Sequence, residues 1–302
     1  MCGCILGSDP SPGYPGNLLR TFQCSEYGEP SLCSFSGDGR YALAVAAETL
    51  LFFELRHGNL MGETDLSAAA VDIAATADGG TVVVLTPQTL LAISISGFEL
   101  QSEIQLEGTA SALSLTPDDL EAWVLHTDGF VTRINASSWQ VISREDTGIP
   151  LAHGLVVSSD GSALLLGDNG DSTVCRLRID DFQIMSESGT FNPVNSLFPG
   201  PEGMFCGIVE GSNEVWFWDE QSCILVYMIT VPDVPLCGAS MSDGSFLYAG
   251  VPGTGLVVAS SSGEHALSTA EYGYPADIAL ESEGWNAILC SPGQMTITIL
   301  EK

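Results

Sequence analysis

Short apolar runs separated by polar turns follow one another along the whole chain. The first clear pair is Tyr41–Ala46 and Thr49–Leu55, divided only by Ala47 and Glu48. Runs of this length, rich in β-branched and aromatic residues, predict β-strands. The alternation of apolar and polar positions within a run such as Phe130–Ala136 is incomplete. We therefore expect strands that are packed on both faces.

An acidic residue, usually followed by Gly, marks a turn at nearly constant spacing. These turn residues are Asp38, Asp78, Asp118, Asp160, Glu202, Asp243 and Glu283. Successive positions differ by 40, 40, 42, 42, 41 and 40 residues. A period of about 40 residues with strands between the turns is typical of a β-propeller. Asp and Gly suit the turn because both tolerate positive φ.

Each repeat contains four predicted strands, which we name A to D in chain order. In the first full repeat they are Ser31–Ser36, Tyr41–Ala46, Thr49–Leu55 and Leu60–Leu66. The seventh repeat provides only Pro275–Glu281, Trp285–Ser291 and Gln294–Glu301. We expect Leu18–Cys24 to supply its missing D strand and so close the ring. The prediction is an all-β, seven-bladed propeller of four-stranded antiparallel blades over residues 18–302, preceded by a disordered leader over residues 1–17.

The charge of the chain excludes several kinds of partner. The formal net charge is -30, from 38 acidic and 8 basic residues, and Lys302 is the single Lys. Nucleic acids and anionic lipid surfaces both require clustered Lys or Arg, so neither is an expected partner. The favoured interpretation is a solvated acidic surface that maintains solubility. The alternative is attraction of cations or basic partners.

Two segments resemble the YVTN or YncE-like family of seven-bladed propellers. One is Pro275–Ala279 with the following Glu283 and Gly284, and the other is the strand, polar turn and strand of residues 163–177. The resemblance covers residues 18–301. The paired Gly-His and Trp-Asp signals of another propeller family, the WD repeats, are absent. The resemblance implies a structural relationship. Relatives of that family include surface-layer proteins, lipoproteins, and binding or electron-transfer subunits.

The N-terminus predicts a tether. The segment Met1-Cys2-Gly3-Cys4 precedes a Pro- and Gly-rich stretch, as in a bacterial lipoprotein just after its cleavage site. In that interpretation Cys2 or Cys4 carries the lipid and the protein belongs to the cell envelope, at the cell surface or in the periplasm. The alternative is a leader whose cysteines have no role. The sequence contains no apolar stretch long enough to span a membrane.

Nine cysteines leave at least one unpaired within a single chain. Five of them lie in apolar runs and are expected to act as small buried hydrophobic residues. These are Cys33, Cys175, Cys206, Cys237 and Cys290.

In a propeller the A strands line the central channel, and the D–A and B–C loops surround its mouth. The position six residues before each acidic turn residue lies on the inner strand of its repeat. It is occupied by Asp in two repeats, at Asp72 and Asp277, and we expect these two side chains to converge at the channel mouth. We expect them to bind a ligand there, or to accept hydrogen bonds from nearby amides, which is the favoured interpretation. Other candidate ligand-binding residues near the mouth are His126, His153, Asn195, Tyr272 and Tyr274.

A second candidate site is the oxygen-rich turn of Asp168, Asn169 and Asp171. Calcium prefers carboxylate and carbonyl oxygens, but the spacing does not match an EF-hand. A polar turn is the favoured alternative. Calcium is the only cofactor that the sequence indicates.

No motif for nucleophilic catalysis is present, and catalysis is not expected. The favoured function is a non-catalytic, extracytoplasmic scaffold that binds a protein, glycan or small ligand on the D–A and B–C loops. One alternative is a metal-dependent lactonase-like or lyase-like enzyme with a site over the channel. Another is an intracellular interaction scaffold similar to WD-repeat proteins. We expect a monomer.

Overall fold

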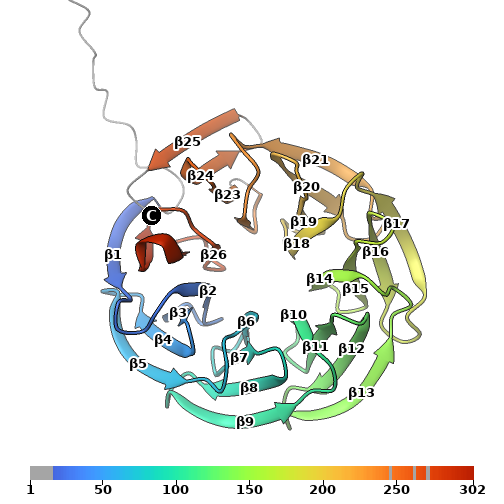
Figure 1. Ribbon diagram of the computed structural model, residues 1–302, viewed down its shortest axis with the longest axis horizontal. Helices are drawn as coiled ribbons and strands as arrows, with labels where there is room; N and C mark the ends of the chain where they lie inside the picture. Colours follow the sequence, from blue (N-terminus) through green and yellow to red (C-terminus); the bar gives the residue numbers. More distant parts are fainter. Residues whose placement is uncertain (1–15, 245–246, 261–262, 270–272) are drawn as a thin grey trace, which may run out of the picture.

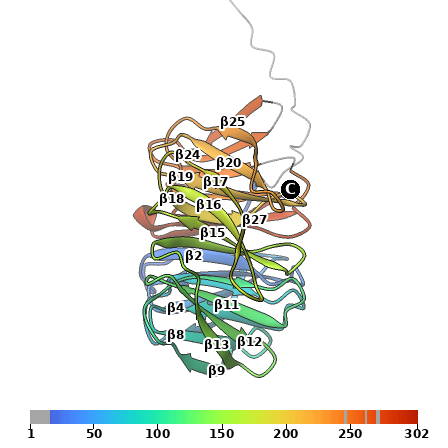
Figure 2. The same cartoon turned by 90° about the vertical axis from the view of Figure 1, so that its right-hand side faces the viewer.

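The computed structural model describes residues 16–244, 247–260, 263–269 and 273–302. Its strands form seven four-stranded antiparallel sheets, which are arranged as blades around a central channel (Figure 1). Turned by 90°, the ring is a thick disc seen edge-on (Figure 2). The predicted all-β, seven-bladed propeller is therefore confirmed.

Each blade runs from an inner strand A beside the channel to an outer strand D at the rim. Blade 1 contains β2 (Pro30–Phe35), β3 (Tyr41–Ala46), β4 (Thr49–Glu54) and β5 (Asn59–Asp65). Blade 2 contains β6 (Asp72–Ala75), β7 (Thr81–Leu85), β8 (Thr89–Ser94) and β9 (Glu99–Gln105). Blade 3 contains β10 (Ala110–Leu115), β11 (Glu121–His126), β12 (Phe130–Asn135) and β13 (Gln140–Asp146). Blades 4 and 5 contain β14 (Ala152–Val157), β15 (Ala163–Asp168), β16 (Thr173–Arg178) and β17 (Ile184–Gly189); and β18 (Val194–Pro199), β19 (Met204–Val209), β20 (Glu214–Asp219) and β21 (Leu225–Thr230). Blades 6 and 7 contain β22 (Cys237–Ser240), β23 (Leu247–Val251), β24 (Gly255–Ser260) and β25 (Gly263–Thr269); and β26 (Asp277–Leu280), β27 (Asn286–Ser291), β28 (Thr296–Glu301) and β1 (Asn17–Gln23).

The N-terminal strand closes the ring. Strand β1 pairs antiparallel with β28, and Thr21 lies opposite Thr298. The first strand of the chain is thus the outer strand of the last blade (Figure 1). This confirms the closure predicted from the missing D strand of the seventh repeat.

A hydroxyl residue two positions before the acidic residue stabilises four of the A–B turns. In blade 2, Oγ1 of Thr76 donates a hydrogen bond to Oδ1 of Asp78 (2.7 Å), which also accepts the Gly80 N–H (2.8 Å). Equivalent hydroxyl–carboxylate bonds occur at Ser36 and Asp38, Thr116 and Asp118, and Ser158 and Asp160. The regularly spaced carboxylates are therefore parts of the turns.

The hydrophobic core lies between neighbouring blades. In strand β3 all residues after Tyr41 are buried, and β4 is buried from Leu50 to Phe53. Even and odd residues of one strand pack against different blades, so both of its faces are apolar. This explains why the apolar–polar alternation was incomplete.

The inner strands of blades 2, 6 and 7 are shorter than predicted. Strands β6, β22 and β26 have four residues each, whereas the pattern predicted the seven-residue runs Ala70–Thr76, Pro235–Met241 and Pro275–Glu281. Strand β28 also begins late, because a 3₁₀ turn over Pro292–Gln294 precedes it. Pattern alone does not define strand ends, since pairing with the next strand sets them.

Two predictions concern residues outside the described part of the chain, namely Cys2 and Cys4 with the leader up to residue 15, and Tyr272. Asn17, the last residue of the predicted leader, begins strand β1. No helix in the described residues is long and apolar enough to cross a membrane.

Candidate binding site in the central channel

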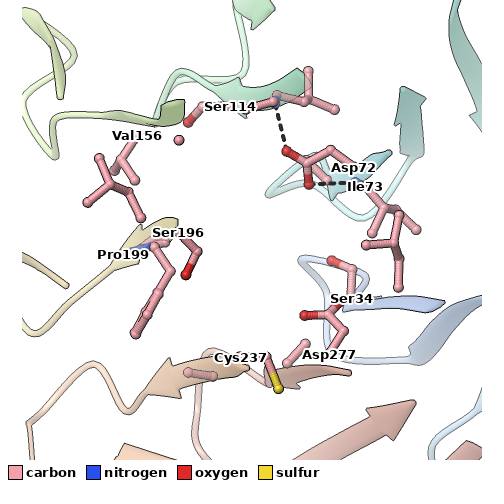
Figure 3. A pocket seen from close by; sticks show the side chains of 18 of the residues that line it. Ser34, Asp72, Ile73, Ser114, Val156, Ser196, Pro199, Cys237 and Asp277 are labelled. Carbon is pink, nitrogen blue, oxygen red and sulfur yellow. Dashed lines mark hydrogen bonds between the residues drawn. The ribbon is translucent and has the colours of Figure 1, made fainter. Parts of the chain in front are cut away.

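The inner strands enclose a cavity of about 630 Å³ along the channel. All seven blades contribute to its wall, which is a mixture of apolar, hydroxyl, thiol and carboxyl side chains. Figure 3 shows Asp72, Ser34 and Asp277 in succession on one side of the channel, with Ser114, Val156 and Ser196 on the other sides.

Asp72 and Asp277 both lie in this wall, one blade to either side of blade 1. Oδ2 of Asp72 accepts the Leu113 N–H of the next blade (2.7 Å), and its Oδ1 accepts the Ile73 N–H (2.8 Å). Oδ2 of Asp277 accepts the Cys33 N–H of blade 1 (2.7 Å). Each carboxylate therefore joins the inner strands of two neighbouring blades.

Both carboxyl groups hold their protons more strongly than an exposed Asp. Burial raises the pKa of Asp72 to about 6 and that of Asp277 to about 7, although amide hydrogen bonds act in the opposite direction. The charge of Asp72 raises the pKa of Asp277 further. These carboxyl groups therefore keep a proton to higher pH than an exposed Asp, and in the protonated form they can donate as well as accept a hydrogen bond.

His153 and Asn195 lie exposed in the wall near the mouth of the cavity. Nε2 of His153 is 2.8 Å from the backbone oxygen of Asn195, and this contact joins blades 4 and 5. The structure therefore brings Asp72, Asp277, His153 and Asn195 to one cavity. Binding of a ligand by these residues remains a prediction.

The remaining candidates lie elsewhere. His126 is fully buried at the end of β11, where Nε2 contacts Oγ1 of Thr132 (2.7 Å), and it does not line the cavity. The sequence placed His126 near the channel mouth, but the structure places it outside the cavity wall, where it makes a local contact. Burial and the charge of Arg144 lower the pKa of His126. Tyr274 is exposed on the loop before β26, outside the cavity wall.

The oxygen-rich turn of blade 4 is held by backbone amides. Oδ1 of Asp168 accepts the N–H groups of Gly170 (2.8 Å) and Asp171 (3.4 Å). Oδ1 of Asn169 accepts the Val194 N–H (2.9 Å). Within the described ranges no three Asp, Glu, His or Cys side chains are grouped so that they could hold a metal ion. The observed geometry is that of a hydrogen-bonded turn, and calcium binding there stays a prediction.

Sequence reasoning missed two kinds of contact that residues of the channel wall make between neighbouring blades. Oγ of Ser114 accepts the Val157 N–H (3.0 Å), so it joins blades 3 and 4 as Asp72 joins blades 2 and 3. Sγ of Cys33 donates to the Ile288 oxygen (3.4 Å) and Sγ of Cys290 to the Leu32 oxygen (3.2 Å), across blades 1 and 7. The repeat spacing identifies the wall positions, but it does not reveal these contacts.

Together these features define a seven-bladed β-propeller with a lined central channel. No family model matches the chain, and no curated protein does. Two similar solved structures are a mitotic checkpoint complex (TM-score 0.78, 13% identity, 98% of this chain and 95% of that chain) and the β-propeller domain of Cps50 (Swd1) from Myceliophteria thermophila (TM-score 0.80, 11% identity, 95% of this chain and 100% of that chain). At such identities the likeness establishes the fold. Membership of the YVTN or YncE-like family stays a prediction.

Proposed function

We propose that this protein is a non-catalytic scaffold that binds a protein partner on the face formed by the D–A and B–C loops, called here the D–A face. The opposite face, formed by the A–B and C–D turns, is called the A–B face. The fold supports this proposal, because one of the similar structures is a propeller within a complex. Two surface properties of the chain support it further.

The first property is an uneven distribution of charge. Arg144 is the one basic residue near the D–A face of the described chain, and its Nη2 lies 2.6 Å from Oδ2 of Asp128. The remaining basic residues lie toward the A–B face, at Arg20, Arg40, Arg56, Arg133, Arg176, Arg178 and Lys302. Exposed carboxylates of the D–A face are Glu26, Glu29, Glu48, Asp65, Glu107, Asp128, Asp146, Asp171, Glu210 and Asp233. Such a face attracts a basic partner.

The second property is an arc of exposed apolar side chains on the same face. One residue near the start of each of blades 4 to 7 belongs to it, namely Leu151, Phe191, Leu236 and Tyr274. Exposed apolar residues within a polar surround are typical of protein interfaces.

Phe191 is the observation that carries the proposal. Its side chain is 91% exposed, and its backbone has φ 65, a left-handed conformation that costs free energy for a bulky residue. Its ring lies edge-on to Trp216 with centroids 6.3 Å apart. A strained and exposed aromatic residue on the D–A face is suited to anchor a partner.

The proposal predicts binding of peptides that combine basic and apolar residues. The probe is an array of synthetic peptides with fixed apolar content and either Lys or Glu at the charged positions, measured by fluorescence anisotropy. We expect the Lys series to bind, and Phe191→Ala to weaken binding by about 10-fold, since an aromatic hot spot contributes about 1–2 kcal/mol.

The matched control is Leu120→Ala, which removes an exposed apolar side chain from the A–B face, where Leu120 is 55% exposed. This variant should bind like the wild type. Equal binding of both peptide series, or equal loss in both variants, would contradict the proposal.

A further inference from the structure

Two cysteines meet at the boundary between the first and the last blade of the ring. Cys33 lies on β2 of blade 1, and Cys290 lies on β27 of blade 7. Sγ of Cys33 donates a hydrogen bond to the Ile288 oxygen (3.4 Å), and Sγ of Cys290 donates to the Leu32 oxygen (3.2 Å). Each sulfur atom therefore lies beside the strand that carries the other.

The two thiol groups also contact each other. Burial raises the pKa of Cys33 well above its usual value, and a hydrogen bond with Cys290 is the next cause of this shift. Both side chains belong to one hydrophobic core cluster, in which Cys33 is 5% exposed and Cys290 is fully buried. The fold therefore holds the two thiols together, away from water, between two blades.

The other described cysteines near a second thiol are placed less favourably. Cys24 belongs to the same core cluster, but β28 lies between β27 and the strand that Cys24 follows, β1. Sγ of Cys175 donates to the Leu166 oxygen of its own blade (3.6 Å), whereas Sγ of Cys223 accepts from Oγ of Ser186 (3.5 Å). Among the described cysteines, Cys33 and Cys290 are thus the pair best placed for a covalent bond.

We infer that Cys33 and Cys290 form a disulfide when the chain folds in the presence of an oxidant, namely a small disulfide such as cystamine. The thiolate of one cysteine attacks a sulfur atom of the oxidant, which gives a mixed disulfide and releases one small thiol. The thiolate of the other cysteine attacks the protein sulfur of the mixed disulfide and releases the second small thiol. The two protein thiols are oxidised to one disulfide, and their two electrons and two protons end on the two small thiols.

Folding is the stage at which this exchange is fast. In the unfolded chain both thiols are open to the oxidant, whereas in the folded protein Cys33 and Cys290 are buried. The same burial protects the finished disulfide from thiols in solution. An oxidising environment during folding therefore gives the bonded form, and a reducing one gives the two free thiols.

The bond strengthens the closure of the ring. The last strands of the chain pair with its first strand, β1, through backbone hydrogen bonds between β28 and β1. A disulfide from Cys290 to Cys33 fixes these last strands to blade 1 as well, and it encloses nearly the whole chain in one loop. Because a long enclosed loop restricts the unfolded chain strongly, we expect the melting temperature of the oxidised form to exceed that of the reduced form by about 4–8 °C.

The test is refolding of the full chain from denaturant with a mixture of cystamine and cysteamine. The leader cysteines are replaced by Cys2→Ser and Cys4→Ser, so that only the seven described thiols can react. Pepsin digestion at low pH, where thiol–disulfide exchange is slow, and mass spectrometry without reduction then identify the linked peptides. We expect one peptide pair joined through Cys33 and Cys290, which dithiothreitol separates. Refolded protein with both thiols free, or with Cys290 joined to Cys24, would overturn the inference.

The matched variants are Cys290→Ala and Cys24→Ala, which remove thiols from the same core cluster. The difference in melting temperature between the oxidised and reduced forms should vanish in Cys290→Ala and persist in Cys24→Ala. The opposite result in either variant would refute the pairing. Cys33→Ala removes the other partner and should behave like Cys290→Ala, so the test does not depend on the folding of a single variant. Melts of the reduced forms establish that each variant is folded.

Discussion

At the scale of single residues, side chains of the inner strands join one blade to the next. Asp72, Ser114, His153 and Asp277 each contact the backbone of the following blade. The repeat spacing identified Asp72 and Asp277 because each lies six residues before an acidic turn residue. Their role as inter-blade acceptors depends on which amide of the next blade comes within reach, and a single chain segment does not contain that information.

The raised pKa of Asp277 predicts an unusual dependence of stability on pH. The folded protein binds this proton up to about pH 7, whereas an unfolded Asp releases it near the ordinary pKa of 3.8. The folded state therefore holds more protons between these values, so the free energy of unfolding falls as pH rises from about 4 to about 7. We expect the free energy of unfolding of Asp277→Asn to fall less across this range, because the Asn side chain does not titrate. Urea denaturation at several pH values measures this free energy for both proteins.

The variant retains one carbonyl oxygen that can accept the Cys33 N–H, so its fold should persist. Asp72→Asn should give the same effect over a range that ends near pH 6, because burial raises the pKa of Asp72 to about 6. Parallel pH profiles for wild type and Asp277→Asn would show that this proton does not contribute.

The cysteines give a second prediction at this scale. Seven described cysteines are unpaired and buried, at Cys24, Cys33, Cys175, Cys206, Cys223, Cys237 and Cys290. Burial raises the pKa of the Cys24 thiol to about 12 and raises those of Cys33, Cys206 and Cys237 well above their usual value. Because the thiolate is the reactive form, we expect slow reaction with a disulfide reagent in the native state.

The measurement uses Cys2→Ser and Cys4→Ser together, which leaves only the seven described thiols. The reagent releases one coloured thiolate for each protein thiol that reacts, which absorbance measures. Rapid release equivalent to all seven thiols should occur only in denaturant. Rapid release from native protein would mean that local opening exposes these thiols.

At the scale of elements, the strands follow from apolar runs, and the turns follow from the Ser/Thr and Asp pairs. The closing strand β1 was predictable because the seventh repeat lacked one strand. Its register with β28 was not, since register depends on the side chains that pack on both sides of the strand. Phe22 provides one such contact, with its ring 5.2 Å from that of Phe53 in blade 1.

Strand β1 therefore joins the ends of the ring through both hydrogen bonds and packing. We expect Phe22→Ala to lower the free energy of unfolding by about 1–3 kcal/mol, less than for a fully buried Phe because Phe22 is only partly buried. Urea denaturation monitored by tryptophan fluorescence measures this difference.

Leu18 is a control on the same strand, since its side chain is 53% exposed. Leu18→Ala should change the free energy of unfolding by no more than about 0.5 kcal/mol. Equal effects of the two substitutions would mean that closure depends on backbone pairing alone.

At the scale of the whole molecule, repulsion between acidic residues opposes the closed, compact ring. The chain contains 38 acidic residues and only 8 basic ones, and most of them lie in the ring. The resulting self-repulsion destabilises the compact state.

Salt should therefore stabilise this protein. We expect the melting temperature of a dilute sample at pH 7 to rise with sodium chloride, because ions screen repulsion between exposed carboxylates. The control is the same titration near the isoelectric point of about 4.1, where little net charge remains to be screened. A melting temperature independent of salt at pH 7 would show that the carboxylates are too far apart, or too well paired, to matter.

The sequence by itself determined the architecture of this protein. Seven turns at a constant period, four strands between them and one displaced strand define the blades and their closure, because each of these features is local or periodic. Only the tertiary structure decided which side chains meet. It buried His126 although its sequence position predicted a loop, and it gathered the basic residues toward the A–B face. Such outcomes depend on contacts between blades, and residues about 40 positions apart in the chain make those contacts.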